Sequence, residues 1–333
     1  MHTRALGPFT VTAIGLGCMS LSHAYGEPPP EKESQELLLK ALDLGYTFFD
    51  TAAIYGFGAN ETLVGKTLMK RRSEFTLASK GGMGPIDGQR VFDSRPAAIK
   101  RDCEDSLRRL GADVIDLYYL HRWDKKTPIE ETIGAMAELK REGKIKALGL
   151  SEISGPTLRK AHAAHPITAV QNEYSLWSRN PEISLVQACR DLGVTLVSFG
   201  AVGRGFFGCK LTSMEGLPKS DIRVTMPRFM GENFQANLKL LDGLKSIALD
   251  TGWTPAQLSL AWVLGRGTDV ISIPGTTRLD HLAENVVAAD LKLDAATTQR
   301  LEALFTEKTV HGARYAPAGQ ATVDTEEHGA LVR

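Results

Sequence analysis

The sequence has few cysteines, no excess of either charge and no long apolar run. Its 39 basic residues balance 39 acidic ones, so net charge provides no general attraction to nucleic acid or to an anionic membrane. The four cysteines form no CxxC pair, which argues against a disulfide scaffold and favours reduced thiols in the cytoplasm. No apolar run approaches the roughly 18 residues that a membrane-spanning helix needs. We therefore expect a soluble, cytoplasmic protein with neither a membrane nor a nucleic-acid partner.

The 333 residues alternate short apolar segments with amphipathic ones. A hydrophobic fraction of 43% and a charged fraction of 23% are ordinary for a folded globular protein. The apolar segments are rich in Val, Ile, Leu, Phe or Tyr and are bounded by Gly or a polar residue, which is typical of strands buried on both faces of a parallel sheet. They are Ala13–Gly17, Tyr46–Asp50, Phe75–Lys80, Val114–His121, Ala147–Ser151, Thr168–Asn172, Val194–Phe199 and Val270–Pro274.

Helical patterns lie between these strands, several of them followed by a glycine that ends the helix. An alternation of eight strands with helices predicts an α/β fold, either a closed barrel or an open doubly wound sheet. The turn Gly15–Ser20 lacks the third glycine of a dinucleotide-binding turn, so we predict a (β/α)8 TIM barrel that forms a single domain over residues 1–333. The predicted helices are Glu33–Leu44, Pro96–Leu110, Glu130–Arg141, Gly155–Ala164, Pro181–Leu192, Thr254–Leu264 and Leu279–Val287.

Three segments are additions to the barrel. Thr3–Thr10, which turns at Gly7-Pro8, is expected to form a small hairpin that closes one barrel mouth. The stretch Arg204–Gln235 is too long for a simple connection and is predicted to be a functional loop at the C-terminal face. The polar tail from about residue 306 is expected to be mobile.

Titratable residues stand where several predicted strands end, and in a barrel these ends share one mouth. Asp50, Lys80 and His121 end strands, and Tyr55 lies on the loop that follows Asp50. A nearby ammonium lowers the pKa of a phenol, a carboxylate holds the lysine in place, and an imidazole orients a carbonyl oxygen or carries the proton. Each residue alone has an ordinary explanation as a rim charge or a packing residue. Their joint occurrence favours a proton-transfer site.

The motifs around these residues resemble the aldo-keto reductase family, over roughly residues 5 to 305. The resemblance implies an NAD(P)H-dependent carbonyl reductase on a (β/α)8 barrel, acting on a small-molecule carbonyl substrate. It further implies that Tyr55 donates the proton, that Lys80 and Asp50 adjust the pKa of Tyr55, and that His121 positions the substrate carbonyl. The motifs are Phe49-Asp50-Thr51-Ala52 with Tyr55-Gly56, Ala78-Ser79-Lys80, Tyr119-Leu120-His121-Arg122, Gly149-Leu150-Ser151-Glu152, Ala169-Val170-Gln171-Asn172-Glu173-Tyr174 and Ile273-Pro274-Gly275-Thr276-Thr277.

The resemblance also implies how the nicotinamide would be held. The ring would stack on Phe199, and its carboxamide would bind Ser151 and Gln171, with Asn172 as a further candidate. Phe199 stands where the family commonly has tyrosine, and stacking needs an aromatic face more than a hydroxyl.

The phosphate groups are assigned to two loops, and NADP (NADPH) is preferred over NAD. Glycines in Gly203-Arg204-Gly205 let backbone amides approach a pyrophosphate, although the family commonly has Ser-Pro-Leu before this motif where this chain has Gly200-Ala201-Val202. Gly275, Thr277 and Arg278 precede a predicted helix, and a helix N-terminus with an arginine suits the 2′-phosphate of NADP. By resemblance, Glu284 and Asn285 approach the adenine side.

Other interpretations stay open at this stage. Lys80 would serve a lyase or aldolase as a Schiff-base nucleophile. The chain would also suit an NADP-binding redox sensor or regulatory subunit with little turnover. Tyr25 and Trp123 either line the substrate pocket or pack in the core. His162 and His165 have a metal-binding spacing but no third ligand nearby, so no metal is predicted. The physiological substrate and the oligomeric state are left open.

Overall fold

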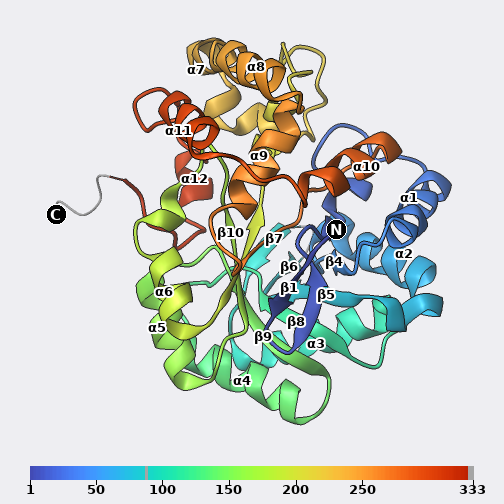
Figure 1. Cartoon of the computed structure of the whole chain (residues 1–333). Helices are drawn as coiled ribbons and strands as arrows, with labels where there is room; N and C mark the ends of the chain where they lie inside the picture. Colours follow the sequence, from blue (N-terminus) through green and yellow to red (C-terminus); the bar gives the residue numbers. More distant parts are fainter. Residues whose placement is uncertain (87–88, 329–333) are drawn as a thin grey trace.

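A curled sheet of eight parallel strands forms the centre of the molecule, in a computed structural model that describes residues 1–86 and 89–328 (Figure 1). A parallel bridge between Ile14 and Ser272 joins its two edges, with Gly15 N donating to Ser272 O at 2.8 Å. The sheet therefore closes into the predicted (β/α)8 barrel. In hydrogen-bonded order the strands are β3 (Leu16–Gly17), β4 (Phe48–Asp50), β5 (Thr76–Gly81), β8 (Ile115–Leu120), β9 (Ile145–Ser151), β10 (Ala169–Glu173), β11 (Thr195–Phe199) and β12 (Val270–Ser272).

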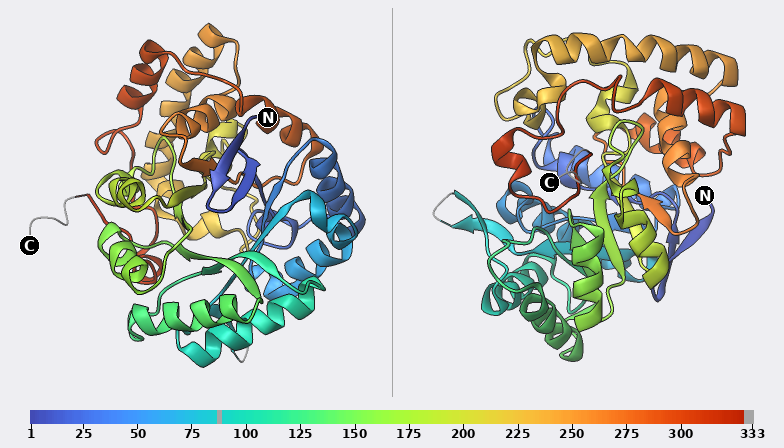
Figure 2. Two further views of the ribbon diagram at one scale, coloured as in Figure 1. Left: turned by 60° about the horizontal axis from the view of Figure 1, so that its bottom comes forward. Right: turned by 90° about the vertical axis from the view of Figure 1, so that its left-hand side faces the viewer.

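Helices surround the strands (Figure 2). Two of them, Pro96–Leu110 and Gly155–Ala164, have the predicted bounds. The predicted helix Pro181–Leu192 is instead interrupted at Ser184, whose φ of −150° and ψ of −26° are not helical and whose hydroxyl bonds to Glu326. The α-helices are α1 (Glu31–Asp43), α2 (Ala59–Leu68), α3 (Pro96–Leu110), α4 (Ile129–Arg141), α5 (Gly155–Ala164), α6 (Leu185–Leu192), α7 (Gly231–Leu238), α8 (Leu240–Thr251), α9 (Pro255–Leu264), α10 (Leu279–Ala288), α11 (Ala295–Leu304) and α12 (Pro317–Gln320).

Side chains of the strands alternate between two apolar clusters, because successive residues of a strand point to opposite faces. Leu77 and Tyr118 belong to the cluster that includes the surrounding helices. Their chain neighbours Ala78 and Leu117 belong to a second cluster that collects residues from the barrel strands β4, β5, β8, β9, β10, β11 and β12. This second cluster fills the barrel, as expected for a fold in which the interior is a packed core.

An antiparallel hairpin precedes the barrel. It pairs β1 (Thr3–Leu6) with β2 (Phe9–Thr12) across a turn in which Gly7 has a φ of +56°, a conformation that glycine adopts without strain. Its buried residues Leu6 and Val11 join the apolar cluster inside the barrel. The hairpin lies across the centre of the ring of helices in the left view of Figure 2.

The long segment after β11 and the tail both have ordered structure. The segment contains the 3-10 helices η5 (Gly203–Gly208), η6 (Ile222–Thr225) and η7 (Pro227–Phe229) before α7 begins. A second antiparallel pair joins β6 (Met83–Ile86) with β7 (Gln89–Phe92). The tail was predicted to be mobile, but its described residues, 306–328, pack against the barrel, and Arg314 and Val323 are buried.

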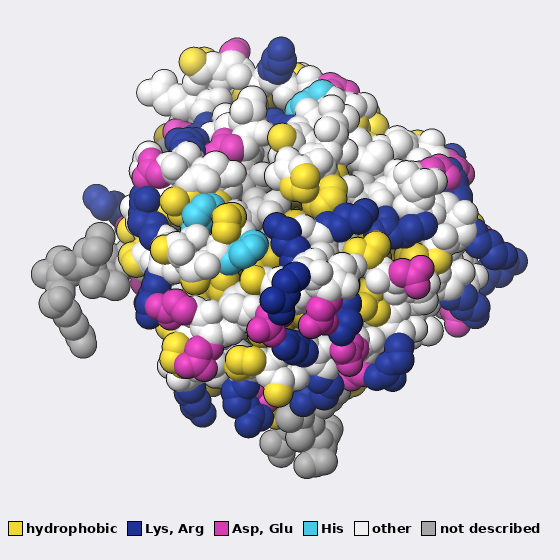
Figure 3. All heavy atoms as spheres, turned by 90° about the horizontal axis from the view of Figure 1, so that it is seen from below, with side chains coloured by type: hydrophobic (Ala, Val, Ile, Leu, Met, Phe, Trp, Pro, Cys, Tyr) yellow, Lys and Arg dark blue, Asp and Glu magenta, His cyan; other side chains and the backbone are white. Residues whose placement is uncertain are grey.

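The surface shows no large region of one charge on the face seen from below, where acidic and basic side chains are interspersed (Figure 3). Within residues 1–86 and 89–328, no helix has both the length and the apolar character needed to cross a membrane.

Two helical glycines provide a test of the packing. A Cβ at Gly65 in α2 would lie 2.2 Å from Leu110 O at the end of α3, whereas a Cβ at Gly134 in α4 would meet nothing within 4 Å. We expect Gly65→Ala to destabilise the fold by about 1–3 kcal/mol or more, because a backbone carbonyl cannot move aside easily. Gly134→Ala should stabilise it by about 0.5–1 kcal/mol. Urea unfolding of both variants measures this difference, and equal effects would contradict the close approach of α2 to α3.

Candidate active site

Four side chains meet at the carboxyl ends of neighbouring strands. Asp50 ends β4, Lys80 lies near the end of β5, His121 follows β8 and Tyr55 begins the 3-10 helix η2 (Tyr55–Gly58). The Lys80 ammonium is fully buried and is bonded to the Asp50 carboxylate. It also donates to Thr51 O at 2.9 Å and to the Tyr55 hydroxyl at 3.4 Å. The residues that the sequence predicted to work together are therefore in one connected group.

An unusual turn follows Tyr55. Gly56, Phe57 and Gly58 all have positive φ, at 55°, 54° and 95°. A Cβ at Gly56 would lie 3.0 Å from the Ser22 Cβ, so this position also requires the small residue. Phe57 adopts the left-handed conformation although it has a side chain, which is uncommon outside functional or tightly constrained turns.

Two imidazoles flank the Tyr55 ring. His121 meets it edge-on, with ring centroids 5.8 Å apart, and the His23 ring lies 5.5 Å away. The Nδ1 atoms of both histidines are buried and have no hydrogen-bond partner among the described residues. The sequence analysis missed His23. The sequence signal that could have identified His23 was its place on the loop after the first barrel strand, at the same mouth as the other site residues.

The protonation states follow from burial and from the neighbouring charges. Burial raises the pKa of Tyr55, and the Lys80 ammonium opposes this only in part, so the phenol keeps its proton at neutral pH. Lys80 was expected to lower the pKa of Tyr55. The Lys80 ammonium does lower the pKa of Tyr55, but burial raises this pKa by more. Burial and the nearby cations Arg122 and Lys80 hold the pKa of His121 well below its usual value, which leaves a neutral imidazole.

Lys80 keeps its charge in this environment. Burial alone lowers the pKa of an amine, but the Asp50 carboxylate and Tyr55 outweigh burial and raise the pKa of Lys80 above its usual value. Asp50 is held on its other side by Gln171, whose Nε2 donates to Oδ2 at 2.7 Å. The lysine is therefore an ammonium locked in an ion pair, which is unsuited to nucleophilic attack on a carbonyl.

A cavity of about 860 Å³ opens above this group. Tyr25 lines it, whereas Trp123 packs against the core and donates its indole N–H to Thr127 O at 2.8 Å. Lys80 and Gly203 are buried and are not among the residues that line it. Glu284 and Asn285 lie outside it: Glu284 accepts from Thr254, and Asn285 is buried. The other predicted site residues line the cavity, namely Asp50, Tyr55, His121, Ser151, Gln171, Phe199, Arg204, Gly205, Gly275, Thr277 and Arg278.

Polar side chains at the ends of β9 and β10 differ in their orientation. Ser151 Oγ accepts from Arg122 Nη1 at 3.1 Å and lines the cavity. Gln171 lines it too while holding Asp50. The amide of Asn172 instead bonds to the backbone of Ile153, with Nδ2 donating to its carbonyl at 3.0 Å. Asn172 therefore anchors the chain beyond β9 and does not face the cavity.

Arg204 is buried behind Phe199 and does not project freely into the cavity. Its guanidinium lies 5.6 Å from the centre of the Phe199 ring and 5.5 Å from that of Tyr315, so it is close to both aromatic rings. It bonds to the Glu173 carboxylate and donates to the Tyr315 hydroxyl at 2.9 Å. Arg204 thus links Phe199 to the tail.

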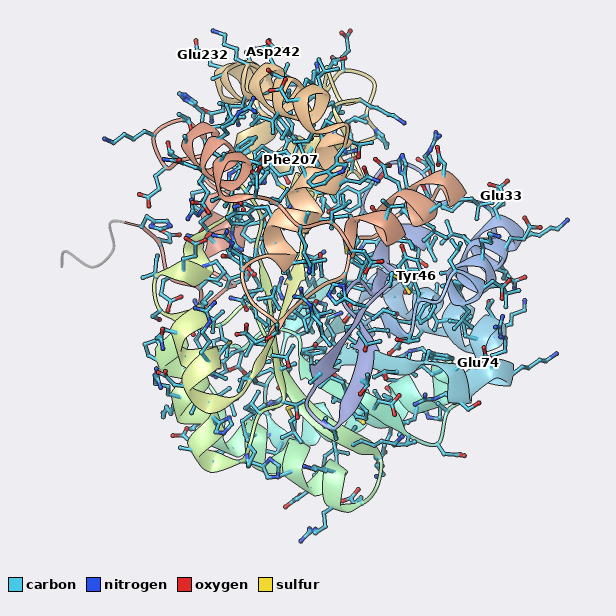
Figure 4. The ribbon with its side chains drawn as sticks, in the orientation of Figure 1. Glu33, Tyr46, Glu74, Phe207, Glu232 and Asp242 are labelled. Atoms are coloured by element: carbon cyan, nitrogen blue, oxygen red, sulfur yellow. The ribbon has the colours of Figure 1, made fainter. Side chains whose placement is uncertain are left out.

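The backbone around Arg204 is held by aromatic packing. Gly203, Arg204 and Gly205 all have positive φ, and the next two residues, Phe206 and Phe207, are fully buried. Trp177 stacks on Phe206 with ring centroids 4.6 Å apart, and Phe207 lies close to α9 in Figure 4. This anchoring places the glycine-rich turn at the edge of the cavity.

The tail forms part of the cavity wall and is attached by charged contacts. Arg314 donates to the Glu152 carboxylate, at 3.1 Å to Oε1. At the N-terminus of α5, Asp324 Oδ2 accepts from the Ser154 hydroxyl at 3.0 Å, and Glu326 Oε1 accepts from Gly155 N at 2.9 Å. Carboxylates are favoured at a helix N-terminus, where backbone N–H groups lack partners.

Glu173 makes this charged network sensitive to pH. Burial alone raises the pKa of Glu173, but Arg204 and Arg314 outweigh it and hold the pKa at about 2. A glutamate in the unfolded chain titrates near pH 4.3, so the ionised side chain stabilises the fold by about 3 kcal/mol above pH 5 and loses this contribution as the pH falls toward 2.

We therefore expect Glu173→Gln to lower the free energy of unfolding by about 3 kcal/mol at pH 7, with a deficit that shrinks as the pH approaches 2. Urea unfolding between pH 7 and pH 2.5 measures the difference from the unmodified protein. Glu215→Gln, at an exposed position, is the control. A deficit that stayed constant over this range would show that Glu173 is not held ionised by the arginines.

The chain is similar to known proteins in both sequence and fold. Residues 13–305 match the sequence model of the Aldo/keto reductase family. The chain is 42% identical over 328 residues to the NADP(+) aldo-keto reductase yakc of Schizosaccharomyces pombe, with 96% of each chain covered. The structure of the glycerol dehydrogenase AKR11B4 from Gluconobacter oxydans is similar with a TM-score of 0.82 and 27% identity, over 91% of this chain and 94% of that one. An aldo/keto reductase from Klebsiella pneumoniae in complex with NADP and acetate has a TM-score of 0.70 and 27% identity, over 94% and 98%. The chain belongs to the aldo/keto reductase family.

Proposed function

We propose that the protein reduces an aldehyde or ketone to an alcohol with NADPH, and that Tyr55 donates the proton. The observation that carries this proposal is the protonated Tyr55 hydroxyl, 3.4 Å from the buried Lys80 ammonium and beside His121 at the base of a large cavity. A proton donor next to a fixed positive charge suits a reaction that develops negative charge on a carbonyl oxygen.

The residues around the substrate have distinct tasks. When bound, NADPH supplies the hydride. The neutral His121 imidazole hydrogen-bonds the carbonyl oxygen and orients it toward Tyr55. Tyr55 gives its proton to that oxygen, and the Lys80 ammonium stabilises the phenolate that remains. Asp50 holds Lys80 in position, and Gln171 holds Asp50.

Several features of the cavity fit the cofactor. The buried Ser20 Oγ, His23 Nδ1 and His121 Nδ1 have no partners within the described chain, and all three residues line the cavity, as expected where a polar ligand binds. Gly17 and Gly275 bring two backbone segments together, since a Cβ at Gly275 would lie 2.9 Å from Gly17 O. The cofactors named for the Schizosaccharomyces pombe relative and the Klebsiella pneumoniae structure support NADP.

The proposed contacts extend along one wall of the cavity. Ser151 and Gln171 bind the carboxamide, Phe199 receives the ring, and the backbone of Gly203, Arg204 and Gly205 faces the pyrophosphate. Gly275, Thr277 and Arg278 bind the 2′-phosphate at the start of α10. Glu284 and Asn285, beyond the cavity, are assigned to the adenine side. Arg278 is paired with Asp280, but both are exposed, so exchanging this partner for a phosphate costs little.

Two other functions are separated from this one by simple observations. A lyase that used Lys80 as a nucleophile needs a neutral amine, and the Asp50 ion pair disfavours that state. A redox sensor would bind NADPH but show negligible turnover with every carbonyl tested.

Tyr55→Phe tests the proton donor. Loss of a general acid typically reduces the rate about 10²–10⁴-fold, and we expect this loss in kcat with NADPH binding retained. The measurement is NADPH oxidation with a panel of aldehydes, together with the cofactor fluorescence change on binding. Tyr118→Phe, which removes a buried hydroxyl outside the cavity, is the matched control. Unchanged turnover of Tyr55→Phe would refute the assignment.

Arg278→Met tests the 2′-phosphate site. A hydrogen bond to a charged group is worth about 1.5–3 kcal/mol, so we expect the KM for NADPH to rise roughly 10- to 100-fold. The KM for NADH should stay the same, because NADH lacks that phosphate. Arg300→Met, which removes an exposed arginine that pairs with Asp250, is the control. An equal change for both cofactors would place the 2′-phosphate elsewhere.

A further inference from the structure

The end of the cavity near Tyr55 contains an arginine that has no counter-ion in the described part of the chain. Arg122 follows His121, is half-buried and lines the cavity. Its Nη1 donates to His121 O at 2.6 Å and to Ser151 Oγ at 3.1 Å. Among the described residues, no carboxylate lies within 4.0 Å of this guanidinium. By contrast, the cavity-lining arginines Arg204, Arg223 and Arg278 each pair with an acid. Arg90, which also lines the cavity, has no acidic partner among the described residues either, but it is exposed to solvent.

The acidic residues of the cavity wall are already engaged. Asp50 is bonded to Lys80 and Gln171. Asp221 accepts from Arg223 Nη2 at 2.7 Å and from Gly26 N at 3.0 Å. No other acidic residue among those described lines the cavity, whereas Arg90 adds another positive charge to the same wall. This end of the cavity is therefore electropositive, and both acidic residues that line it in the described part of the chain are already paired.

Arg122 is placed to act on the substrate and not on the cofactor phosphates. Its contacts with His121 and Ser151 hold the guanidinium next to the group formed by Asp50, Tyr55, Lys80 and His121. The proposed phosphate contacts, at Gly203–Gly205 and Arg278, lie on different loops. The rest of the wall near Tyr55 is largely apolar, with Met19, Ile54, Met83 and Phe92 among the residues that line it. A partly desolvated guanidinium gains most from an anion that binds in its plane with two hydrogen bonds.

We propose that Arg122 binds a carboxylate of the substrate, so that the preferred substrates are aldehydes or ketones that carry a carboxylate on an apolar body. This inference rests on the proposed carbonyl reduction and adds the class of carbonyl compound. The carboxylate supplies the missing counter-ion, the apolar side chains contact the body of the molecule, and the carbonyl faces Tyr55 and His121.

The test compares matched substrates that differ only in charge. We would measure kcat/KM with NADPH for 3- and 4-carboxybenzaldehyde and for their methyl esters. The unmodified protein should prefer at least one of the acids over its ester by tenfold or more, with a preference that falls as the salt concentration rises. Arg122→Met should bring the acid-to-ester ratio close to one, mainly through the KM of the acid, and Arg122→Lys should retain part of the preference.

Arg101→Met is the control for net charge, because Arg101 is an exposed residue of α3 that does not line the cavity. It should leave the acid-to-ester ratio unchanged. Because the acid and the ester are compared with the same variant, a general loss of activity lowers both values and leaves the acid-to-ester ratio unchanged.

The possible failures are distinguishable. Reduction of the esters without a preference for either acid would overturn the role of Arg122 and leave the carbonyl reductase in place. Absence of turnover with all four aldehydes would count against the proposed function. In that case, calorimetric binding of the corresponding carboxybenzyl alcohols and their esters, with and without NADP, still decides whether Arg122 selects an anion. Equal binding of acid and ester would refute it.

Discussion

The ion pair between Lys80 and Asp50 is the interaction on which the candidate site depends. An ammonium without solvent contact is costly unless a counter-ion and hydrogen bonds compensate for lost hydration. Asp50 and Thr51 O provide that compensation from the neighbouring strand and its loop, and Gln171 holds Asp50 from the other side of the barrel. Because all these groups lie on or next to barrel strands, the charge beneath Tyr55 is fixed before a substrate arrives. Such preorganisation suits a site that must stabilise a developing phenolate.

A second charged network performs a different task at the same mouth. Glu173 at the end of β10 holds Arg204 between Phe199 and Tyr315, and Glu152 after β9 holds Arg314. Glu152 itself has a φ of +54°, an unusual conformation for a residue with a side chain. This network joins the tail and the glycine-rich turn to the strands. The first network lies beneath the proposed proton donor, and the second fixes the wall on which the proposed cofactor rests.

The strands and the positions of the candidate catalytic residues were predictable because their signals are local. Buried parallel strands have short apolar sequences, and Pro and Gly mark the two ends of Pro96–Leu110. Residues at strand ends must share one barrel mouth, so Asp50, Lys80 and His121 were identified together. The interruption at Ser184 was not predictable in this way, because it coincides with a contact to Glu326 in the tail. His23 was missed because a lone histidine on a loop has no distinctive spacing.

The sequence alone determined the alternation of strands and helices, the barrel and the group of residues around Tyr55, since these follow from hydrophobic pattern, turn residues and strand ends. Only the tertiary structure decided which charges are paired. It buried Arg204 behind Phe199, turned Asn172 toward Ile153 and packed the polar tail against the barrel. It also left Arg122, beside Ser151 and His121, without an acidic partner among the residues that the structure describes. The physical reason is that a charge is stabilised by whatever lies within a few ångströms, and in this barrel those neighbours come from distant parts of the chain.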